Sequence, residues 1–242
     1  MEIKINKQYL HTKDDFIKYI TENNKELDPH KSDEGRIYEN IILVKNYITA
    51  KDINEILHLE MFKFSLNKII KINLTANDLE SIPTVFNSLP ELKTLILNNN
   101  KIQKISNLDN QTKLEKLELR GNKIKKIENL SCLKNLQKLT LSCNLISNIE
   151  ENDFPQIDSL IELGLFGNFL GIENKTFGEN INKENIQKLK NISGTLKMKF
   201  KNLKGLYIGG NFFTNLICKS SNENYKDIIS SIIPNIIIDG QN

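Results

Sequence analysis

The sequence contains few of the residues from which disulfide frameworks and metal centres are built. Its three cysteines, Cys132, Cys143 and Cys218, follow no framework spacing and leave one unpaired, which is typical of a protein from a reducing compartment. Its three histidines share no metal-site spacing with a cysteine or carboxylate. Neither a phosphate-binding Walker loop nor a Gly-x-Ser-x-Gly nucleophile motif occurs. We therefore expect no metal, no cofactor, no small-molecule substrate and no catalytic residue.

Long apolar runs and a strong charge imbalance are also missing. No segment approaches the roughly 18 apolar residues of a membrane span, and residues 1–7 lack the apolar stretch of a secretory signal. The net charge of +3 is small for a nucleic-acid-binding protein. These features predict no membrane partner, make RNA a less favoured partner than protein, and favour the cytoplasm or nucleus.

One pattern dominates what is present. The frame Leu-x-x-Leu-x-Leu-x-x-Asn-x-Leu, with Ile or Phe allowed for Leu, fits six times, for example at Leu114, Leu117, Leu119, Asn122 and Ile124. The intervals between the framing asparagines are 23, 22, 22, 24 and 43 residues. These predicted structural asparagines are Asn77, Asn100, Asn122, Asn144, Asn168 and Asn211. A fixed period of this length indicates a solenoid.

Each position of the frame has a physical reason. The Leu-x-Leu alternation describes a short strand with one buried face. The asparagine follows where the chain turns inward, and its amide can pair with backbone groups that the turn leaves free. One unit cannot bury its apolar face alone, so neighbouring units must stack.

The pattern resembles the leucine-rich-repeat superfamily over roughly residues 38–240. The segment from Asn122 to Leu130, Asn-Lys-Ile-x-Lys-Ile-x-Asn-Leu, resembles the short 22-residue subclass of protein phosphatase 1 regulators, the spliceosomal A-prime protein and dynein light chain 1. This resemblance implies an α/β fold: a right-handed solenoid with a parallel β-sheet on its concave face and a cap at each end. Tyr225 to Gly240 resembles the C-terminal cap of that subclass.

The ends and one insertion depart from the frame. We interpret residues 1–37 as an N-terminal helical extension or cap, with a helix over 12–27, and residues 38–242 as the repeat domain. A further helix is predicted after Thr49, which would cap it. The domain includes an insertion at 171–201 and a C-terminal cap at 222–242. In the insertion we predict an amphipathic helix over 182–190, then a strand or hairpin arm through Leu196, Met198 and Phe200; a degenerate additional repeat is the alternative.

The outward strand positions are the candidate binding surface, because they line the concave face of such solenoids. Aromatic and arginine side chains most often dominate binding energy, and a row of lysines could steer an acidic partner. The predicted partner-binding residues are Lys71, Ile96, Asn98, Lys116, Glu118, Arg120, Lys138, Phe166 and Tyr207.

These observations predict a non-enzymatic scaffold or regulatory subunit that binds a macromolecular partner on the concave face. The alternatives are a ribonucleoprotein component that contacts a protein and RNA, and a ciliary or cytoskeletal adaptor. Phosphatase-binding members of the subclass use concave aromatic and acidic residues, whereas this chain has no Trp and a more basic, glycine-rich face. The lysine-rich stretch 183–204 is the feature that favours RNA.

Overall fold

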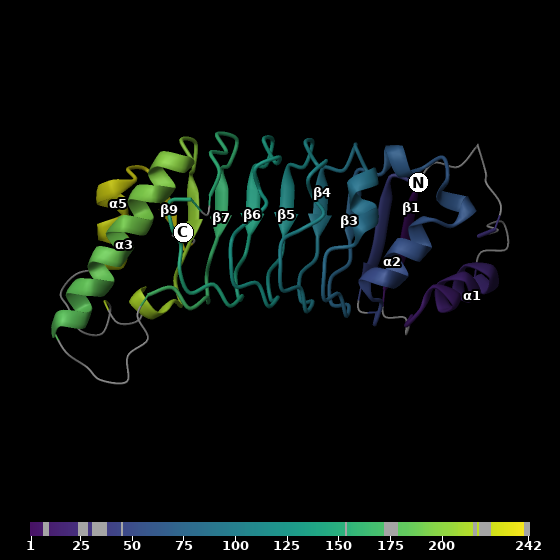
Figure 1. Ribbon diagram of the computed structural model, residues 1–242, viewed down its shortest axis with the longest axis horizontal. Helices are drawn as coiled ribbons and strands as arrows, with labels where there is room; N and C mark the ends of the chain where they lie inside the picture. The colour runs from purple at the N-terminus through teal and green to yellow at the C-terminus, as the bar shows by residue number, and fades with distance from the viewer. Residues whose placement is uncertain are drawn as a thin grey trace.

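The protein forms one open parallel sheet of nine strands, which lie in the order of the sequence (Figure 1). The structure is a computed structural model that describes residues 1–6, 10–23, 29–30, 38–44, 46–152, 154–171, 179–214, 217 and 224–239. The strands are β1 (Glu2–Asn6), β2 (Asn40–Val44), β3 (Lys71–Asn73), β4 (Thr94–Ile96), β5 (Lys116–Glu118), β6 (Lys138–Thr140), β7 (Glu162–Gly164), β8 (Gly205–Tyr207) and β9 (Ile237–Ile238). The predicted α/β solenoid with a parallel sheet is confirmed.

Helices cluster at the two ends, and irregular turns close the back of the central repeats. Among the described residues, four α-helices have bounds at both ends: α1 (Lys13–Asn23), α2 (Ala50–Leu57), α3 (Glu179–Lys199) and α5 (Tyr225–Ile232). The described part of the chain also contains short 3-10 helices: η1 (Glu60–Phe62), η2 (Leu66–Lys68) and η3 (Thr84–Ser88).

The core is a stack of equivalent side chains. Leu95, Leu117 and Leu139 are paired in register at the centres of β4, β5 and β6, and none of the three is exposed. Apolar residues of the back turns, such as Ile105 and Ile127, are equally buried. Each repeat thus covers the apolar face of the next.

The framing asparagines connect each repeat to the one before it. The Nδ2 group of Asn122 donates to the carbonyl oxygens of Leu119 (2.9 Å) and Leu97 (3.0 Å), and its Oδ1 accepts from the backbone N–H of Ile102 (3.0 Å). The other five asparagines make the same three types of bond. These bonds satisfy backbone groups that a buried turn would otherwise leave unpaired.

A second, shorter asparagine row lies on the back turns and was not predicted. Asn107 and Asn129 both have φ 58° and donate through Nδ2 to the carbonyl oxygens of Ile82 (2.6 Å) and Ile105 (2.7 Å). Asparagine tolerates this left-handed backbone better than most residues. These two asparagines therefore join neighbouring back turns, as the framing asparagines join neighbouring repeats next to the sheet.

The N-terminal end contains a strand that the sequence analysis did not predict. β1 pairs in parallel with β2 and places the buried Ile3 and Ile5 against the end of the core. The predicted helix near residues 12–27 is present as α1; residues 24–27, and 31–37 of the proposed extension, lie outside the described residues. Thr49 caps α2 as predicted: its side chain accepts from the N–H of Asp52, whose carboxylate accepts from the N–H of Thr49.

The insertion is helical where we predicted a strand or hairpin arm. α3 continues to Lys199, so the prediction for Leu196 to Phe200 was wrong. Its buried residues Leu189, Ile192 and Leu196 recur at intervals of three or four, which is the helical period. The alternative of an extra repeat is also wrong, because β7 pairs directly with β8. Residues 172–178 of the insertion lie outside the described part.

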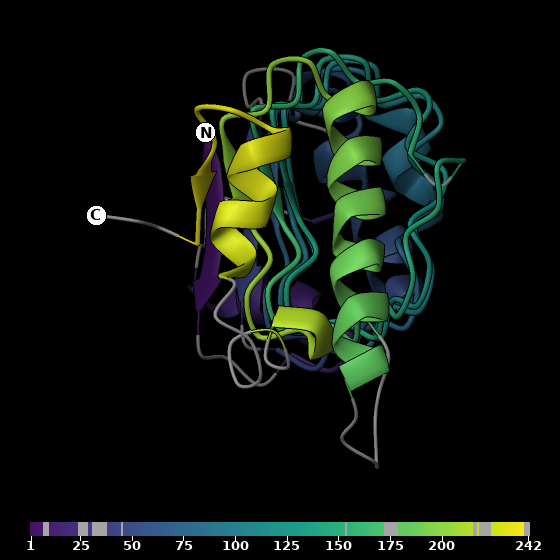
Figure 2. The same cartoon turned by 90° about the vertical axis from the view of Figure 1, so that its left-hand side faces the viewer.

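Two helices cover the C-terminal end of the core. α3 and α5 lie side by side across it, with β9 as the last strand of the sheet (Figure 2). Asn224 caps α5 by accepting a hydrogen bond from the N–H of Lys226 at 3.0 Å. Residues 222–223 and 240–242 of the proposed cap lie outside the described residues, as does Cys218.

Candidate functional site

The strand register sets the outward side chains in two parallel rows. One row contains Asn73, Ile96, Glu118, Thr140, Gly164 and Tyr207. The other contains Lys71, Thr94, Lys116, Lys138, Glu162 and Gly205. Arg120, Ser142 and Phe166 follow two positions after Glu118, Thr140 and Gly164, where the strands give way to turns.

The predicted lysine row is largely paired. Lys116 Nζ lies 2.7 Å from Glu118 Oε1, and Lys138 Nζ lies 2.6 Å from Glu162 Oε2. The hydrogen bond that Lys138 donates to Glu162 raises the pKa of Lys138, although partial burial opposes this shift. Such half-exposed pairs stabilise a fold by only about 0–1 kcal/mol. The row therefore offers less free positive charge than its sequence indicates.

The side chains of Asn98 and Glu118 are hydrogen-bonded to each other. Asn98 Nδ2 donates to Glu118 Oε2 at 2.7 Å, and Asn98 Oδ1 accepts from the backbone N–H of Arg120 at 2.8 Å. Burial acts to raise the pKa of Glu118, but hydrogen bonds from Lys116 and Asn98 outweigh it, so the pKa lies below its usual value. Glu118 thus remains an anion held in place by its neighbours.

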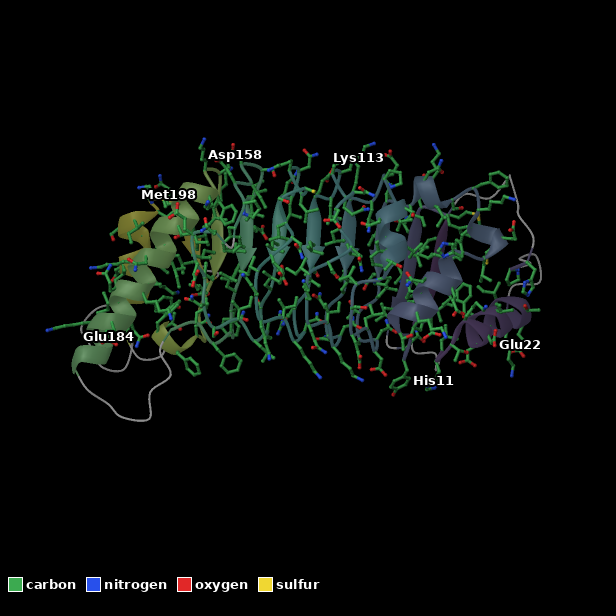
Figure 3. The ribbon with its side chains drawn as sticks, in the orientation of Figure 1. His11, Glu22, Lys113, Asp158, Glu184 and Met198 are labelled. Atoms are coloured by element: carbon green, nitrogen blue, oxygen red, sulfur yellow. The ribbon has the colours of Figure 1, made fainter. Side chains whose placement is uncertain are left out.

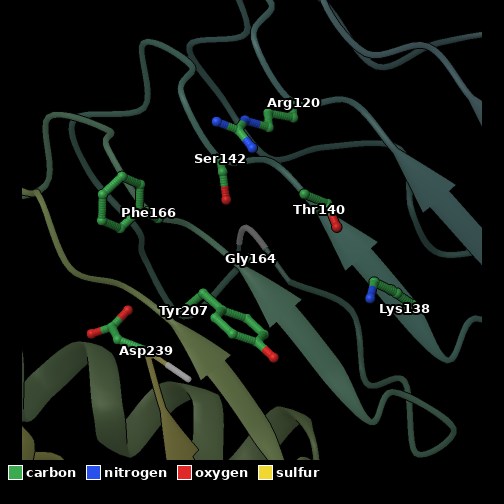
Figure 4. A pocket seen from close by; sticks show the side chains of 8 residues that line it. All are labelled: Arg120, Lys138, Thr140, Ser142, Gly164, Phe166, Tyr207 and Asp239. Carbon is green, nitrogen blue, oxygen red and sulfur yellow. The ribbon is translucent and has the colours of Figure 1, made fainter. Parts of the chain in front are cut away.

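A hollow opens on the concave face toward the C-terminal end, where Gly164 lacks a side chain between Thr140 and Tyr207. Figure 4 shows this concave hollow. Its volume is about 410 Å³, and a Cβ on Gly164 would meet Ser142 Oγ at 3.0 Å and Thr140 Cγ2 at 3.2 Å. The lining residues are Arg120, Lys138, Thr140, Ser142, Gly164, Phe166, Tyr207 and Asp239.

The walls of the hollow combine exposed aromatic area with the arginine side chain of Arg120. Phe166 is 47% exposed and Tyr207 is 37% exposed. The ring of Phe166 lies against the turn at Gly210, where a Cβ would come within 3.2 Å of it. The guanidinium of Arg120 has no hydrogen-bond or carboxylate partner among the described residues. Aromatic and arginine side chains often dominate binding energy once a partner buries them.

Asp239 reaches the hollow from the C-terminal cap, and the sequence analysis did not select it. Its Oδ1 accepts from the backbone N–H groups of Ile208 (2.7 Å) and Gly209 (2.9 Å), and its Oδ2 accepts from the Tyr225 hydroxyl (2.6 Å). These bonds attach the cap to β8. The carboxylate also supplies the hollow with an acidic wall opposite Arg120.

The structure therefore brings together four of the nine predicted partner-binding residues: Arg120, Lys138, Phe166 and Tyr207. Lys116 and Glu118 lie in β5, one strand further from Gly164 than Lys138 in β6. The remaining three, Lys71, Ile96 and Asn98, lie in or just after β3 and β4 and are half-buried. The sequence could locate the rows, but only the three-dimensional register showed where the hollow interrupts them.

The lining residues determine which chemistry the hollow could support. The eight lining residues include no histidine or cysteine that could activate Ser142 or Thr140 as a nucleophile. Within the described ranges no three His, Cys, Asp or Glu side chains gather in a way that could hold a metal ion. None of the described helices is long and apolar enough to cross a membrane.

Comparisons with known proteins identify the repeats. Two family models match: "Leucine rich repeat" at residues 67–124 and "Leucine Rich repeats (2 copies)" at residues 112–155. No curated protein sequence matches the chain.

Solved structures show the same fold. An internalin of Listeria monocytogenes is 20% identical with a TM-score of 0.57, covering 85% of this chain and 55% of its own. A leucine-rich-repeat protein of Leptospira interrogans is 24% identical with a TM-score of 0.52, covering 84% and 55%. TLR13 in complex with the single-stranded RNA ssRNA13 is 23% identical with a TM-score of 0.53, covering 72% and 22%. The chain thus spans about half the length of the first two, and these similarities describe the fold alone.

Proposed function

We propose that this chain, a leucine-rich-repeat solenoid, is a non-enzymatic scaffold or regulatory subunit that binds a protein partner in the concave hollow. Leucine-rich-repeat proteins generally mediate protein–protein interaction, and curved parallel sheets are their usual docking surface. The four 22- to 24-residue intervals support a place in the short-repeat subclass. The free thiols of Cys132 and Cys143 support residence in the cytoplasm or nucleus.

One observation carries the proposal. The missing side chain at Gly164 leaves a hollow of about 410 Å³, surrounded by Phe166, Tyr207 and an Arg120 that has no carboxylate partner in the described part of the chain. A side chain of the partner could enter the gap, be covered by the two rings and place a carboxylate on Arg120. Residues of these types each contribute about 2 kcal/mol or more when buried at an interface, which is roughly 30-fold in affinity.

The test begins with affinity purification of the tagged chain from its native cells and mass spectrometry of what co-purifies in stoichiometric amount. The recovered protein is then titrated against the wild type and the variants Arg120→Glu, Phe166→Ala and Tyr207→Ala. Phe64→Ala is a matched control, because Phe64 is also exposed (39%) but lies outside the hollow. Losses of about 10-fold or more for each hollow variant are expected. Unchanged affinity in all three would refute the assignment.

A ribonucleoprotein component is the second candidate. A similar solved structure, TLR13, is described in complex with single-stranded RNA, and α3 contributes the exposed Lys183, Lys190 and Lys197. RNA binding requires neutralisation of phosphates, so its affinity falls steeply with salt. Affinity that drops by orders of magnitude between low and physiological salt, and that Lys190→Glu weakens, would favour RNA over a protein partner.

A further inference from the structure

The edge of the solenoid at which the strands end changes character along its length. The residue after each framing asparagine lies on this edge, and neighbouring repeats are joined there by backbone bonds such as Leu145 N–H to Ile124 O (2.8 Å) and Phe169 N–H to Ile146 O (2.9 Å). Figure 3 labels Lys113 and Asp158 on the opposite edge, where the strands begin. In chain order the row is Asp78, Lys101, Lys123, Leu145, Phe169 and Phe212.

The second half of this row is apolar and partly open to solvent. Leu145 is 38% exposed and Phe169 is 41% exposed. Phe212 is half-buried and packs against Phe169 with ring centroids 5.5 Å apart at 60°. We call Leu145, Phe169 and Phe212 the apolar edge. Single exposed apolar residues are common on protein surfaces, but here the solvent-facing positions of three consecutive repeats are apolar and form one patch.

The first half of the row is charged. Lys101 is paired with Asp78 at 2.8 Å, but Lys123, the residue next to the apolar edge, is exposed and has no ion-pair partner among the described residues. A ligand that runs along the row would therefore meet three apolar side chains and then the ammonium group of Lys123.

The spacing of the row selects the shape of that ligand. Neighbouring strands of a sheet lie about 4.8 Å apart, so the four positions from Phe212 to Lys123 span about 14 Å. An α-helix rises about 5.4 Å per turn, whereas alternate residues of a strand are about 6.6 Å apart. A helix laid along the edge can thus place one side chain per repeat over three turns, and an extended segment cannot.

We propose that the apolar edge binds an amphipathic α-helix of a partner protein. The helix presents large apolar residues at positions i, i+4 and i+7 to Phe212, Phe169 and Leu145, in that order, and an acidic residue one turn beyond i+7 to Lys123. This site is separate from the concave hollow, and none of its residues lines that hollow.

The experiment is a selection against the full chain from a displayed library of helical peptides in which four positions, one per turn, are varied. Enriched peptides are expected to carry large apolar residues at three consecutive positions and Asp or Glu at the fourth. Phe169→Ser and Lys123→Glu should each weaken the selected peptides at least 10-fold. Replacing the peptide's acidic residue by lysine should restore affinity for Lys123→Glu. Phe64→Ser, a substitution of another exposed phenylalanine, should leave affinity unchanged, and circular dichroism checks that each variant is folded.

Three results would overturn the proposal. The first is a selection with no enrichment, and the second is enriched peptides that bind both variants as well as the wild type. The third is a wild-type dimer in sedimentation that Phe169→Ser converts to a monomer, since a second copy would then occupy the edge. Tyr207→Ala should not affect the selected peptides, so this test and the test of the concave hollow can fail independently.

Discussion

Substitution of a framing asparagine should destabilise the solenoid by an amount that the hydrogen bonds predict. Asn122 is 6% exposed, and Asn122→Ala removes its bonds with Ile102, Leu97 and Leu119. The N–H of Ile102 loses its only partner among the described residues, which costs about 1–3 kcal/mol. Leu97 O and Leu119 O each keep one bond, from Asn100 and from Asn144, so each of these losses is about 0.5–1.5 kcal/mol.

The free energy of unfolding should therefore fall by about 2–6 kcal/mol in urea titrations followed by circular dichroism. Asn135→Ala is the matched control, because this exposed asparagine donates one bond, to Thr112 O at 2.7 Å, and its loss should cost about 1 kcal/mol or less. Equal losses for Asn122→Ala and Asn135→Ala would refute the reasoning.

Shared acceptors make a sharper prediction for double variants. Asn100 and Asn122 both donate to Leu97 O, so removing both leaves that carbonyl without a side-chain donor. The double variant should lose more stability than the two single variants together. Asn77 and Asn144 share no acceptor, and their effects should add. Additivity in both pairs would contradict the proposed network.

Three further perturbations test particular parts of the structure. Gly121→Ala should destabilise the protein by about 1–3 kcal/mol, because φ is +69° and a Cβ would lie within 3.5 Å of the Asn99 backbone. A Cβ at Gly194 in α3 would meet nothing within 4 Å, so Gly194→Ala should stabilise the protein by about 0.5–1 kcal/mol. The urea midpoints of the two variants should therefore move in opposite directions. Leu196→Asp should unfold the C-terminal end of α3, whereas Met198→Asp, at a position that is 57% exposed, should change stability little. Similar losses of stability for the two variants would indicate that both side chains lie on the buried face of a strand rather than on opposite sides of a helix. The pKa of Glu118 is lowered, so the carboxylate contributes to folding stability above its ordinary pKa of 4.5, and this contribution is lost as the pH falls through the folded-state pKa. The difference in unfolding free energy between the wild type and Glu118→Gln should therefore shrink below pH 4.5. A difference that does not depend on pH would contradict the lowered pKa.

The central repeats were predictable because their signal is local and repeated. Leu117, Leu119 and Asn122 have the same offsets as their counterparts one repeat away, so the register of β5 against β4 and β6 follows from the sequence. The rows of outward residues follow from the same register. What the sequence could not supply is how those side chains pair. Lys138 was predicted as part of a lysine row that could steer an acidic partner, but it forms an ion pair with Glu162 on the next strand.

The ends were less predictable because their signals are short. Ile3 and Ile5 alternate over only a few residues, outside the repeat frame, and their place in the sheet is set by pairing with β2. Leu196, Met198 and Phe200 fit a period of two as well as part of a helix. Only the longer spacing from Leu189 onward identifies the helix. Short patterns of this kind are decided by tertiary packing.

The concave hollow depends on both kinds of information. The repeat frame assigns Gly164, Phe166 and Tyr207 to outward positions. Only the side-chain placement shows that they form a hollow with two aromatic walls. Asp239 comes from the cap, 32 residues after Tyr207 in the sequence, and reaches the hollow because β9 pairs with β8. No frame position could have indicated this residue.

Site-specific photo-cross-linking in the native cells would test the central claim most directly. A benzophenone amino acid replaces Tyr207 on the concave wall or, in a separate variant, the exposed Lys134 away from the hollow. The account predicts a discrete, protease-sensitive adduct from position 207 and none from position 134. Equal adducts at the two positions, or an adduct at position 207 that nuclease rather than protease removes, would contradict it.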